Sequence, residues 1–343
     1  METRRLGKTE HEGPVVVFAG IAAGRLEKSE AVEALNRCLD KGIIHIDVAP
    51  SYGDSEVKIG EVMKHRRKGV FLAAKTLERS KEGAAKELRQ SLRNLQTDWL
   101  DLYQLHAVDT DEDLERVLAP DGAIAAIQEA QQEGLVRFIG ITGHRPDIQA
   151  RALKLFDFDT VLTPVNFIDR FIMNTEGGLL PLAEKMDVGV ISMKATYRGA
   201  IQDVETAYRY TLSQKVARTV PTGDIGEVEQ AIDLAASPRP MSVEEMEMLF
   251  RDAPDLGNLY CRQCGYCLPC PVGIDIPRIF AMEGYYSRYR KDIAVKQFAI
   301  QPIKPGACTA CGLCDERCPF GLKVMKRMKG MEDKLAGKME PGV

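Results

Sequence analysis

The 343-residue sequence contains no long run of apolar residues and no excess of charge of one sign. Its longest apolar run, Val15 to Gly24, has about ten residues, whereas about 20 are needed to span a bilayer. Lys plus Arg number 46 and Asp plus Glu number 50, so the net charge is −4 and no chain-wide field attracts nucleic acid. We therefore expect neither a membrane nor a nucleic acid among the partners of this protein.

The first residues, METRRLGKTEHEG, are charged and lack the apolar stretch of a secretory signal peptide. We therefore expect a cytoplasmic protein. Hydrophobic residues make up 45% of the sequence and charged residues 28%, which is typical of a globular protein and excludes the disordered and collagen-like classes. The length corresponds to about two domains of roughly 150 residues each.

The nine cysteines are unevenly distributed along the chain. Cys38 stands alone, and the other eight lie between positions 261 and 318. In a reducing compartment, clustered cysteines indicate metal ligands rather than disulfides. Cys38 shares one helical face with Val32, Leu35 and Leu39, so we interpret it as a thiol of the hydrophobic core.

Strand-like and helix-like segments alternate along residues 1–236. Eight short runs, most of them β-branched, are typical of strands buried on both sides, at 15–20, 43–48, 70–75, 100–106, 136–142, 160–166, 188–193 and 217–221. Helical patterns follow them at 29–41, 55–67, 82–96, 121–134, 147–155, 178–187, 204–215 and 225–236. Eight such units predict an α/β fold of the (β/α)8 TIM barrel type, with a hairpin before residue 15 at its floor. A doubly wound open sheet is the alternative, but no G-x-G-x-x-G follows the first strand.

The alternation ends at SPRP, residues 237–240, where two prolines in four residues indicate a domain boundary. Ser242 and Glu245 then have the spacing of a capping box, which predicts a helix through about Phe250. Cysteine-containing loops and helices follow, including a helix at 277–289 that begins with a proline. We therefore predict a barrel over 1–236, a linker and helix over 237–260, and a small, mainly α-helical domain over 261–343.

The eight clustered cysteines form two runs, C-x2-C-x2-C-x2-C-P and C-x2-C-x2-C-x3-C-P. The second matches the run of bacterial ferredoxins, in which three thiolates hold one [4Fe–4S] cluster and the fourth, beside a proline, reaches the other cluster. This pattern predicts a ferredoxin-like domain with two clusters, one bound by Cys261, Cys264, Cys267 and Cys318 and the other by Cys308, Cys311, Cys314 and Cys270. Structural zinc and unliganded thiols are the alternatives, although zinc does not call for the triple x2 spacing.

Polar residues lie at or just after the C-terminal ends of the second, third and fourth predicted strands, where a (β/α)8 barrel carries its catalytic groups. They are Asp47, Tyr52, Lys75 and His106. A free phenol has a pKa of about 10, and a nearby ammonium lowers that pKa by stabilising the phenolate. A carboxylate keeps the ammonium charged, and a neutral imidazole holds a carbonyl oxygen. Any one of these residues alone favours a structural role, but together they predict a site that reduces a carbonyl group with a hydride from a cofactor.

With these residues the chain resembles the aldo/keto reductases. The start ETRRLGKTE, the run HIDVAPSYGDSEVKIGEVM, and the segments AAKT and LYQLH carry the resemblance over roughly residues 1–236. The whole chain resembles the branch that has a C-terminal α-helical ferredoxin-like domain. The resemblance implies NAD(P)H-dependent reduction of an aldehyde or ketone, with Tyr52 as the acid, Lys75 and Asp47 as its tuners, and His106 as the group that orients the carbonyl.

The resemblance also implies contacts to the nicotinamide at the rim of the barrel. A Ser-Asn pair often binds the nicotinamide amide in this family, and here the pair is Thr142-Gly143, followed by His144. Asn166, at the end of the sixth strand, is a further candidate. Lys194 follows the seventh strand and is expected to reach a phosphate.

The phosphate site of a barrel is expected in the loops after the seventh and eighth strands. The segment PTGDIGEVEQ, residues 221–230, fits because Thr222 and Gly223 lead into a helix N-terminus whose N–H groups attract anions, although an ordinary loop is the alternative. The segment has acidic residues but no Lys or Arg for the 2′-phosphate of NADP(H). We expect a weaker preference for NADPH over NADH than is usual in the family, unless Lys194 or Arg218 binds that phosphate.

Two other functions stay open at this point. One is an electron-transfer protein whose clusters pass electrons to a redox partner protein while the barrel is a docking scaffold. The other gives the clusters a structural or oxygen-sensing role. The complete set of four barrel residues favours an enzyme that acts on a small carbonyl substrate.

Overall fold

A computed structural model describes the chain at residues 1–197, 201, 203–221, 223–257, 261, 265–288, 291–318 and 321–336. Two residues with predicted roles, Thr222 and Cys264, lie outside the described residues. The chain divides into two compact units. The first unit comprises Met1–Thr196 and Asp203–Met246, and the second comprises Tyr197–Gln202 and Glu247–Val343.

An eight-stranded parallel sheet forms the centre of the first unit, with strand order β10-β9-β8-β7-β6-β5-β4-β3. The strands are β3 (Phe18–Ala19), β4 (His45–Asp47), β5 (Phe71–Thr76), β6 (Leu100–Leu105), β7 (Val136–Thr142), β8 (Thr160–Pro164), β9 (Gly189–Met193) and β10 (Arg218–Val220). The first and last strands also meet, because Val17 N donates to Thr219 O at 2.9 Å and Thr219 N donates to Val15 O at 2.7 Å. This closure confirms the predicted (β/α)8 barrel.

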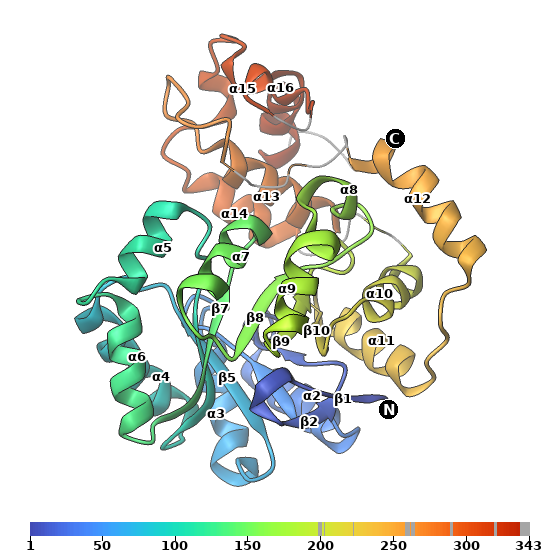
Figure 1. Ribbon diagram of the computed structural model, residues 1–343. Coiled ribbons are helices and arrows are strands. Elements are labelled where there is room, and N and C mark those ends of the chain that lie inside the picture. Colours follow the sequence, from blue (N-terminus) through green and yellow to red (C-terminus); the bar gives the residue numbers. More distant parts are fainter. Residues whose placement is uncertain are drawn as a thin grey trace. The chain divides into compact units, whose positions relative to one another are not determined.

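Helices follow the strands and surround them (Figure 1). The main ones are α2 (Lys28–Asp40), α3 (Ser55–Arg66), α4 (Lys81–Leu95), α6 (Ala123–Gln132), α7 (Pro146–Leu155), α9 (Leu180–Lys185), α10 (Val204–Ser213) and α11 (Ile225–Ala236). Shorter helical segments are α1 (Gly20–Ala23), α8 (Arg170–Met173) and the π-helical turn η2 (Thr175–Leu179). One further helix, α5 (Asp111–Leu118), begins where the Thr110 side chain accepts a hydrogen bond from Asp113 N, and it was not predicted.

A two-stranded hairpin precedes the barrel, as predicted. Its strands β1 (Thr3–Arg5) and β2 (Glu12–Pro14) are antiparallel and flank the short helix η1 (Gly7–Thr9). The Arg4 guanidinium donates to Val216 O at 2.6 Å, just before β10, and Lys8 N donates to Asp187 O at 2.7 Å, just before β9. The hairpin therefore lies at the N-terminal ends of the strands, which is the floor of the barrel.

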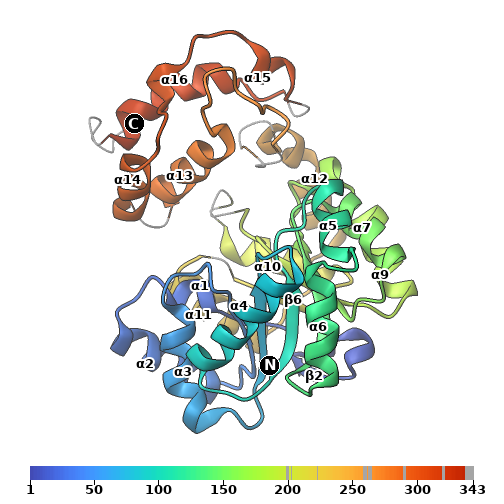
Figure 2. The same cartoon turned by 90° about the vertical axis from the view of Figure 1, so that its left-hand side faces the viewer.

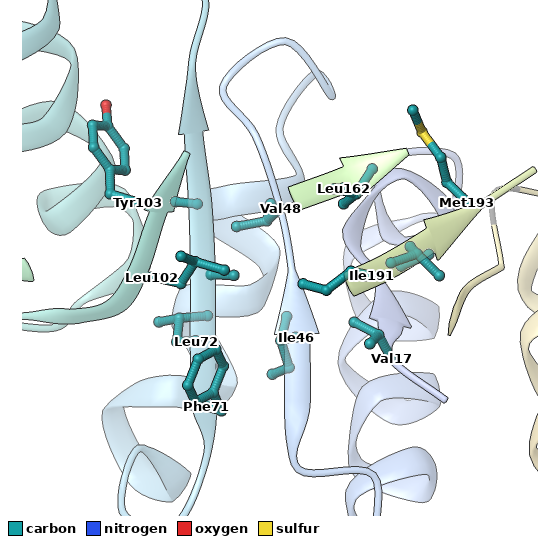
Figure 3. Packing of buried hydrophobic residues seen from close by; sticks show 14 of the residues in the cluster. Val17, Ile46, Val48, Phe71, Leu72, Leu102, Tyr103, Leu162, Ile191 and Met193 are labelled. Carbon is teal, nitrogen blue, oxygen red and sulfur yellow. The ribbon is translucent and has the colours of Figure 1, made fainter. Parts of the chain in front are cut away.

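Strand side chains alternate between the barrel interior and the layer beneath the helices. The floor layer of the interior contains Phe71, whose ring centroid lies 4.7 Å from that of His45 and 6.2 Å from that of Phe138. Figure 3 shows other buried side chains of this core on several strands of the barrel, among them Ile46 on β4, Leu102 on β6 and Ile191 on β9. The packed floor leaves the C-terminal ends of the strands as the face for polar groups.

The second unit is mainly helical (Figure 2). It contains α13 (Ile276–Arg288), α14 (Lys291–Ala299), η3 (Pro305–Ala307), α15 (Leu313–Glu316) and α16 (Val324–Leu335), and α12 (Val243–Gly257) spans the division between the units. Its core includes Ile279, Phe298, Met328 and Leu335. The predicted capping box is present at the start of α12, because Ser242 N donates to Glu245 Oε2 at 2.8 Å and Glu245 N donates to Ser242 Oγ at 3.2 Å. No helix in the described part of the chain is both long and apolar enough to cross a membrane.

Candidate active site

Three of the four predicted catalytic side chains are in contact at the C-terminal end of the barrel. Asp47 ends β4, Tyr52 lies in the loop before α3, and Lys75 lies near the end of β5. The Lys75 ammonium donates a hydrogen bond to Asp47 Oδ2 and lies 3.3 Å from the Tyr52 hydroxyl oxygen and 3.4 Å from Val48 O. The structure therefore brings the phenol, the ammonium and the carboxylate together as predicted.

The Lys75–Asp47 pair is almost fully buried, with 1% and 3% of the side-chain surfaces exposed. Burial lowers the pKa of Lys75, but the Asp47 carboxylate and the Tyr52 phenol outweigh it, so the pKa stays above its usual value. Gln104 on β6 donates to Asp47 Oδ1 at 3.0 Å, so both carboxylate oxygens are engaged. Gln104 was not predicted, because an interior amide on a strand carries no distinctive sequence signal.

His106 follows β6 directly and completes the set. Its ring lies edge-on to the Tyr52 ring, with centroids 6.0 Å apart and an interplanar angle of 88°. Burial, followed by the positive charge of Lys75, holds the pKa of His106 well below its usual value, so the imidazole is neutral. Among the described residues, Nδ1 has no hydrogen-bond partner. A phenol backed by an ammonium, with a neutral imidazole beside it, is suited to bind a carbonyl oxygen and give it a proton.

The predicted nicotinamide contacts after β7 and β8 already have partners within the protein. Thr142 Oγ1 accepts a hydrogen bond from Ala107 N at 3.0 Å. Asn166 Nδ2 donates to Asp169 Oδ2 at 2.9 Å, and Asn166 Oδ1 accepts from the backbone N–H groups of Ile168 and Asp169. Both residues lie at the C-terminal rim, as predicted, and their polar atoms fix the local loops.

His144, at the same rim, pairs with Asp109 from the loop after β6. The two carboxylate oxygens of Asp109 accept from His144 N and contact His144 Nδ1, the latter at 2.9 Å. Burial raises the pKa of Asp109, but the bonds and charge of His144 outweigh it and hold the pKa at about 2. A Cβ at Gly143 would lie 2.7 Å from Val108 O and 2.8 Å from Asp109 Oδ1, so a side chain at this position would disrupt the pair.

The expected phosphate loop lies between β10 and α11. The Asp224 side chain caps α11 by accepting from Glu227 N at 3.0 Å. The buried Glu227 carboxylate accepts from Tyr208 Oη at 2.7 Å and from Thr196 Oγ1 at 3.2 Å, and burial raises its pKa. The loop therefore presents carboxylates beside the helix N-terminus, as the sequence predicted.

A cation missed by the sequence prediction reaches this loop. The Arg25 guanidinium, from the segment between β3 and α2, donates to Gly223 O. Lys194 follows β9, the strand on the other side of β10. Arg25 and Lys194 therefore follow the two strands that neighbour β10, and the positive charge of Lys194 also reaches Asp109 in the loop after β6. Arg25 was missed because β3 and β10 become neighbours only when the barrel closes.

Of the two alternatives for the 2′-phosphate, Lys194 and Arg218, the structure excludes Arg218. Arg218 is the first residue of β10, so it lies at the floor, at the opposite end from the catalytic groups. Its guanidinium is fully buried and contacts Nδ1 of His45 and Nδ1 of His11, both at 2.7 Å. Burial lowers the pKa of Arg218 to about 10.

The cysteine loops of the second unit meet at one cavity. Five cysteines line it, namely Cys267, Cys270, Cys308, Cys311 and Cys314, together with apolar side chains that include Ile274, Met325 and Met328. Among the described residues, no three His, Cys, Asp or Glu side chains converge tightly enough for a single metal ion. The structure therefore brings thiols of both cysteine runs to one cavity.

Two protein-family models match this chain. The model of the aldo/keto reductase family matches residues 18–246. The model of the 4Fe-4S dicluster domain matches residues 260–323. The first region contains the four catalytic candidates, and the second contains all eight clustered cysteines.

Similar sequences and structures come from several organisms. The chain is 26% identical to the uncharacterized oxidoreductase YqkF of Bacillus subtilis (strain 168), over 59% of this chain and 67% of that protein. It is 29% identical to the L-galactose dehydrogenase of Arabidopsis thaliana, over 59% of this chain and 68% of that protein. The B. subtilis aldo-keto reductase YhdN is 27% identical, over 54% of this chain and 57% of that protein. The aldo-keto reductase AKR11C1 from Bacillus halodurans (holo form) has a similar fold, with a TM-score of 0.62 and 24% identity over 73% of this chain and 96% of that chain.

Proposed function

This chain belongs to the aldo/keto reductase family and is an NAD(P)-dependent oxidoreductase with a 4Fe–4S domain, and we propose that it reduces an aldehyde or ketone to an alcohol. The observation that carries this proposal is the placement of the Lys75 ammonium between the Asp47 carboxylate and the Tyr52 hydroxyl. A neutral His106 lies beside them. These are the groups that a carbonyl oxygen needs when it gains negative charge.

The four residues have separate roles in this proposal. The carbonyl oxygen accepts hydrogen bonds from Tyr52 and His106, which orient and polarise it. A bound nicotinamide supplies the hydride for the carbonyl carbon. Tyr52 gives its proton to the oxygen, and the ammonium of Lys75 stabilises the phenolate that remains. Asp47 keeps that ammonium charged and directed at the phenol.

We propose that the loop at Gly223 binds the cofactor phosphates, with the Arg25 guanidinium beside it, and that Lys194, which follows β9, is a further phosphate contact. Thr222 stays a proposed contact in the same loop. Thr142 and Asn166 are proposed to border the nicotinamide end, since Thr142 ends β7 and Asn166 follows β8, the next two strands of the barrel after β6, which leads to His106. The carboxylate of Glu227 close to Gly223 favours a ribose hydroxyl over a 2′-phosphate, because like charges repel.

For the second unit we propose two [4Fe–4S] clusters with exchanged ligands. Cys308, Cys311 and Cys314 line one cavity with Cys270, which supports Cys270 as the fourth ligand of that cluster. Cys261, Cys264, Cys267 and Cys318 then hold the other cluster. The cavity also includes Cys267, so the two clusters are expected to be close together.

The test of the proposed reaction is a carbonyl screen with NADH and NADPH on protein purified anaerobically, with Tyr52→Phe as the key variant. The variant is expected to lose about 10²–10⁴-fold in rate, because it lacks the proton donor. Its affinity for the cofactor, measured by fluorescence titration, is expected to stay unchanged. Tyr103→Phe, which removes a buried hydroxyl from β6, is the matched control. A Tyr52→Phe variant with more than half of the activity removes Tyr52 from this role, and a protein that oxidises neither nicotinamide with any carbonyl refutes the reaction.

A second function, electron exchange with a partner protein, is favoured by the charge around the cysteine cavity. Cys308 and Cys311 are exposed. From Lys304 to Lys329, the exposed charged side chains in the described part of the chain are five cations, Lys304, Arg317, Lys323, Lys326 and Lys329, and one anion, Glu316. Three of the cations lie on α16 or directly before it, on the face opposite its buried apolar residues. We propose that this face binds an acidic protein that carries single electrons.

Charge reversal tests this second function. Lys323→Glu, Lys326→Glu and Lys329→Glu together are expected to slow reduction of the clusters by a reduced acidic ferredoxin at low ionic strength. The wild-type rate is expected to fall as salt rises, and the triple variant is expected to lose that dependence. The control reverses three exposed lysines of the barrel unit, Lys68, Lys86 and Lys154. Equal rates and equal salt dependence in the two triple variants refute the docking face.

A further inference from the structure

The residue after His106 has an unusual backbone conformation. Ala107 has φ = 54°, in the left-handed region that residues other than glycine rarely adopt. Such a conformation persists only where the surrounding structure enforces it, and it is common at active sites. The question is therefore what holds Ala107 in this conformation.

Arg79 provides the first part of the answer. Its guanidinium donates to His106 O at 2.9 Å and to Ala107 O at 3.0 Å. It is itself oriented by Asp113, which accepts from Arg79 Nε at 3.0 Å. The planar fork of an arginine fixes two acceptors at once, so Arg79 sets the position of two consecutive carbonyl groups.

Thr142 provides the second part. Its hydroxyl oxygen accepts from Ala107 N at 3.0 Å, and its carbonyl accepts from Val108 N at 2.9 Å. His106 N donates to Thr76 O at 2.8 Å. Every backbone polar group from His106 N to Val108 N therefore has a partner on β5, the loop after β5, or β7.

The side chain of His106 has no comparable support. Its Nδ1 is buried and has no hydrogen-bond partner among the described residues. The direction of the imidazole consequently depends on the backbone that carries it and on packing against neighbours such as Tyr52.

We propose that Arg79 and Thr142 are positioning residues, which clamp the His106–Ala107 backbone in a strained turn and so aim the imidazole at the carbonyl oxygen. This inference rests on the proposed carbonyl reduction. In this inference Thr142 acts by positioning His106, and it does not bind the nicotinamide directly. An error in position of about 1 Å at a reacting group costs about 10²-fold in rate, so the clamp is expected to matter for turnover.

The test compares Arg79→Met, Arg79→Lys and Thr142→Val with the wild type. Arg79→Met is expected to lower kcat by ~10–100-fold while the dissociation constant of the cofactor, measured without substrate, changes less than about twofold. Arg79→Lys keeps the positive charge but loses the planar guanidinium that binds two carbonyl groups, so its kcat is expected to be almost as low as that of Arg79→Met. Two double variants add Ala107→Gly, one to Arg79→Met and the other to Thr142→Val. The glycine removes the strain at position 107, but it leaves the turn free to adopt other conformations, so kcat is expected to stay low. Arg89→Met, at an exposed arginine of α4, is the matched control.

Crystal structures of the wild type and of Arg79→Met separate this inference from the proposed function. A displaced or disordered His106 ring in the variant supports the clamp even if the carbonyl screen fails. An unmoved ring, or an unchanged kcat in a folded Arg79→Met variant, overturns it. Loss of thermal stability alone, with kcat unchanged, shows that Arg79 only ties loops together and also overturns it.

Discussion

Cys270 and Cys308 line the same cavity, although 308 − 270 = 38 positions separate them in the sequence. Cys267, the cysteine nearest to Cys270 in the sequence, lines this cavity too, and the cavity also contains Cys311 and Cys314 of the second run. This placement suits the exchange of the fourth ligand that is found in two-cluster ferredoxins.

Cys270→Ala is therefore expected to damage the cluster held by Cys308, Cys311 and Cys314. The measurement is iron and sulfide content together with electron paramagnetic resonance of the reduced, anaerobic protein. The spectrum of Cys270→Ala is expected to match that of Cys308→Ala and to differ from that of Cys261→Ala. Cys38→Ala, at a buried thiol of the barrel, is the control and is expected to keep all clusters. A match between Cys270→Ala and Cys261→Ala contradicts the exchange.

The stability of the barrel is expected to decrease in mild acid. Burial, followed by the charge of Arg218, lowers the pKa of His11 to about 4 and holds the pKa of His45 well below its usual value. The unfolded chain, with histidine pKa values of about 6.5, binds more protons than the folded chain between about pH 6.5 and pH 4. The free energy of unfolding therefore falls as the pH decreases through this window and is insensitive to these groups above it.

Trp99 makes this prediction measurable, because it is the single tryptophan of the sequence and lies in the barrel unit, stacked 3.7 Å from the Arg67 guanidinium carbon. Denaturant unfolding is followed by its fluorescence, anaerobically, at about pH 7.5 and about pH 5. His11→Asn retains an acceptor for Arg218 but does not titrate. Its free energy of unfolding is therefore expected to fall less between about pH 7.5 and about pH 5 than that of the wild type. If the free energy of unfolding falls equally in the variant and the wild type, His11 does not cause the pH dependence.

How far the sequence predicted the fold depends on the length and pattern of each segment. The eight strands were predicted within three residues at each end, because apolar β-branched runs buried on both sides are distinctive. Helix α5 was missed because only Leu114 and Val117 of its eight residues are buried, which leaves almost no apolar stripe.

The four candidate catalytic residues were predictable because they stand at or just after strand ends, and strand ends meet in a barrel. Three other residues of the site could not be predicted, because their partners come from other strands and loops and no local pattern marks them. They are Arg25, Arg79 and Gln104. The sequence also left Arg218 open as a phosphate ligand, for a definite reason. β10 has only three residues, Arg218–Val220. Arg218 therefore lies at the floor end of the strand, although it is only two positions before Val220 at the rim end.

The cofactor preference is expected to lean less toward NADPH than is usual in the family. The carboxylate of Glu227 lies beside Gly223, where it is expected to disfavour a 2′-phosphate, whereas the guanidinium of Arg25 at the same loop is expected to favour phosphates in general. We expect the dissociation constants of NADH and NADPH to differ by less than about tenfold, which corresponds to about 1.4 kcal/mol. Glu227→Gln is expected to shift the ratio toward NADPH, and Glu229→Gln, which changes a surface pair with Arg37, is the control. Much tighter binding of NADPH by the wild type contradicts this assignment of the phosphate loop.

The last prediction is that carbonyl turnover does not pass its electrons through the clusters. Hydride transfer moves two electrons together, whereas an iron–sulfur centre exchanges single electrons. A flavin normally connects the two kinds of chemistry, and the sequence has no recognisable flavin motif. The groups around Lys75 need only a nicotinamide and a proton, so the clusters are expected to stabilise their own domain or to serve a separate partner.

The experiment mixes protein whose clusters have been reduced anaerobically with a carbonyl substrate and no nicotinamide. The clusters are expected to stay reduced, as followed by their visible absorbance, until an acidic single-electron acceptor is added. Wild-type protein with NAD(P)H serves as the positive control for turnover, and Tyr52→Phe, with intact clusters, separates the two activities. Stoichiometric reoxidation of the clusters with formation of alcohol would overturn the prediction, because electrons would then reach the carbonyl without a hydride donor.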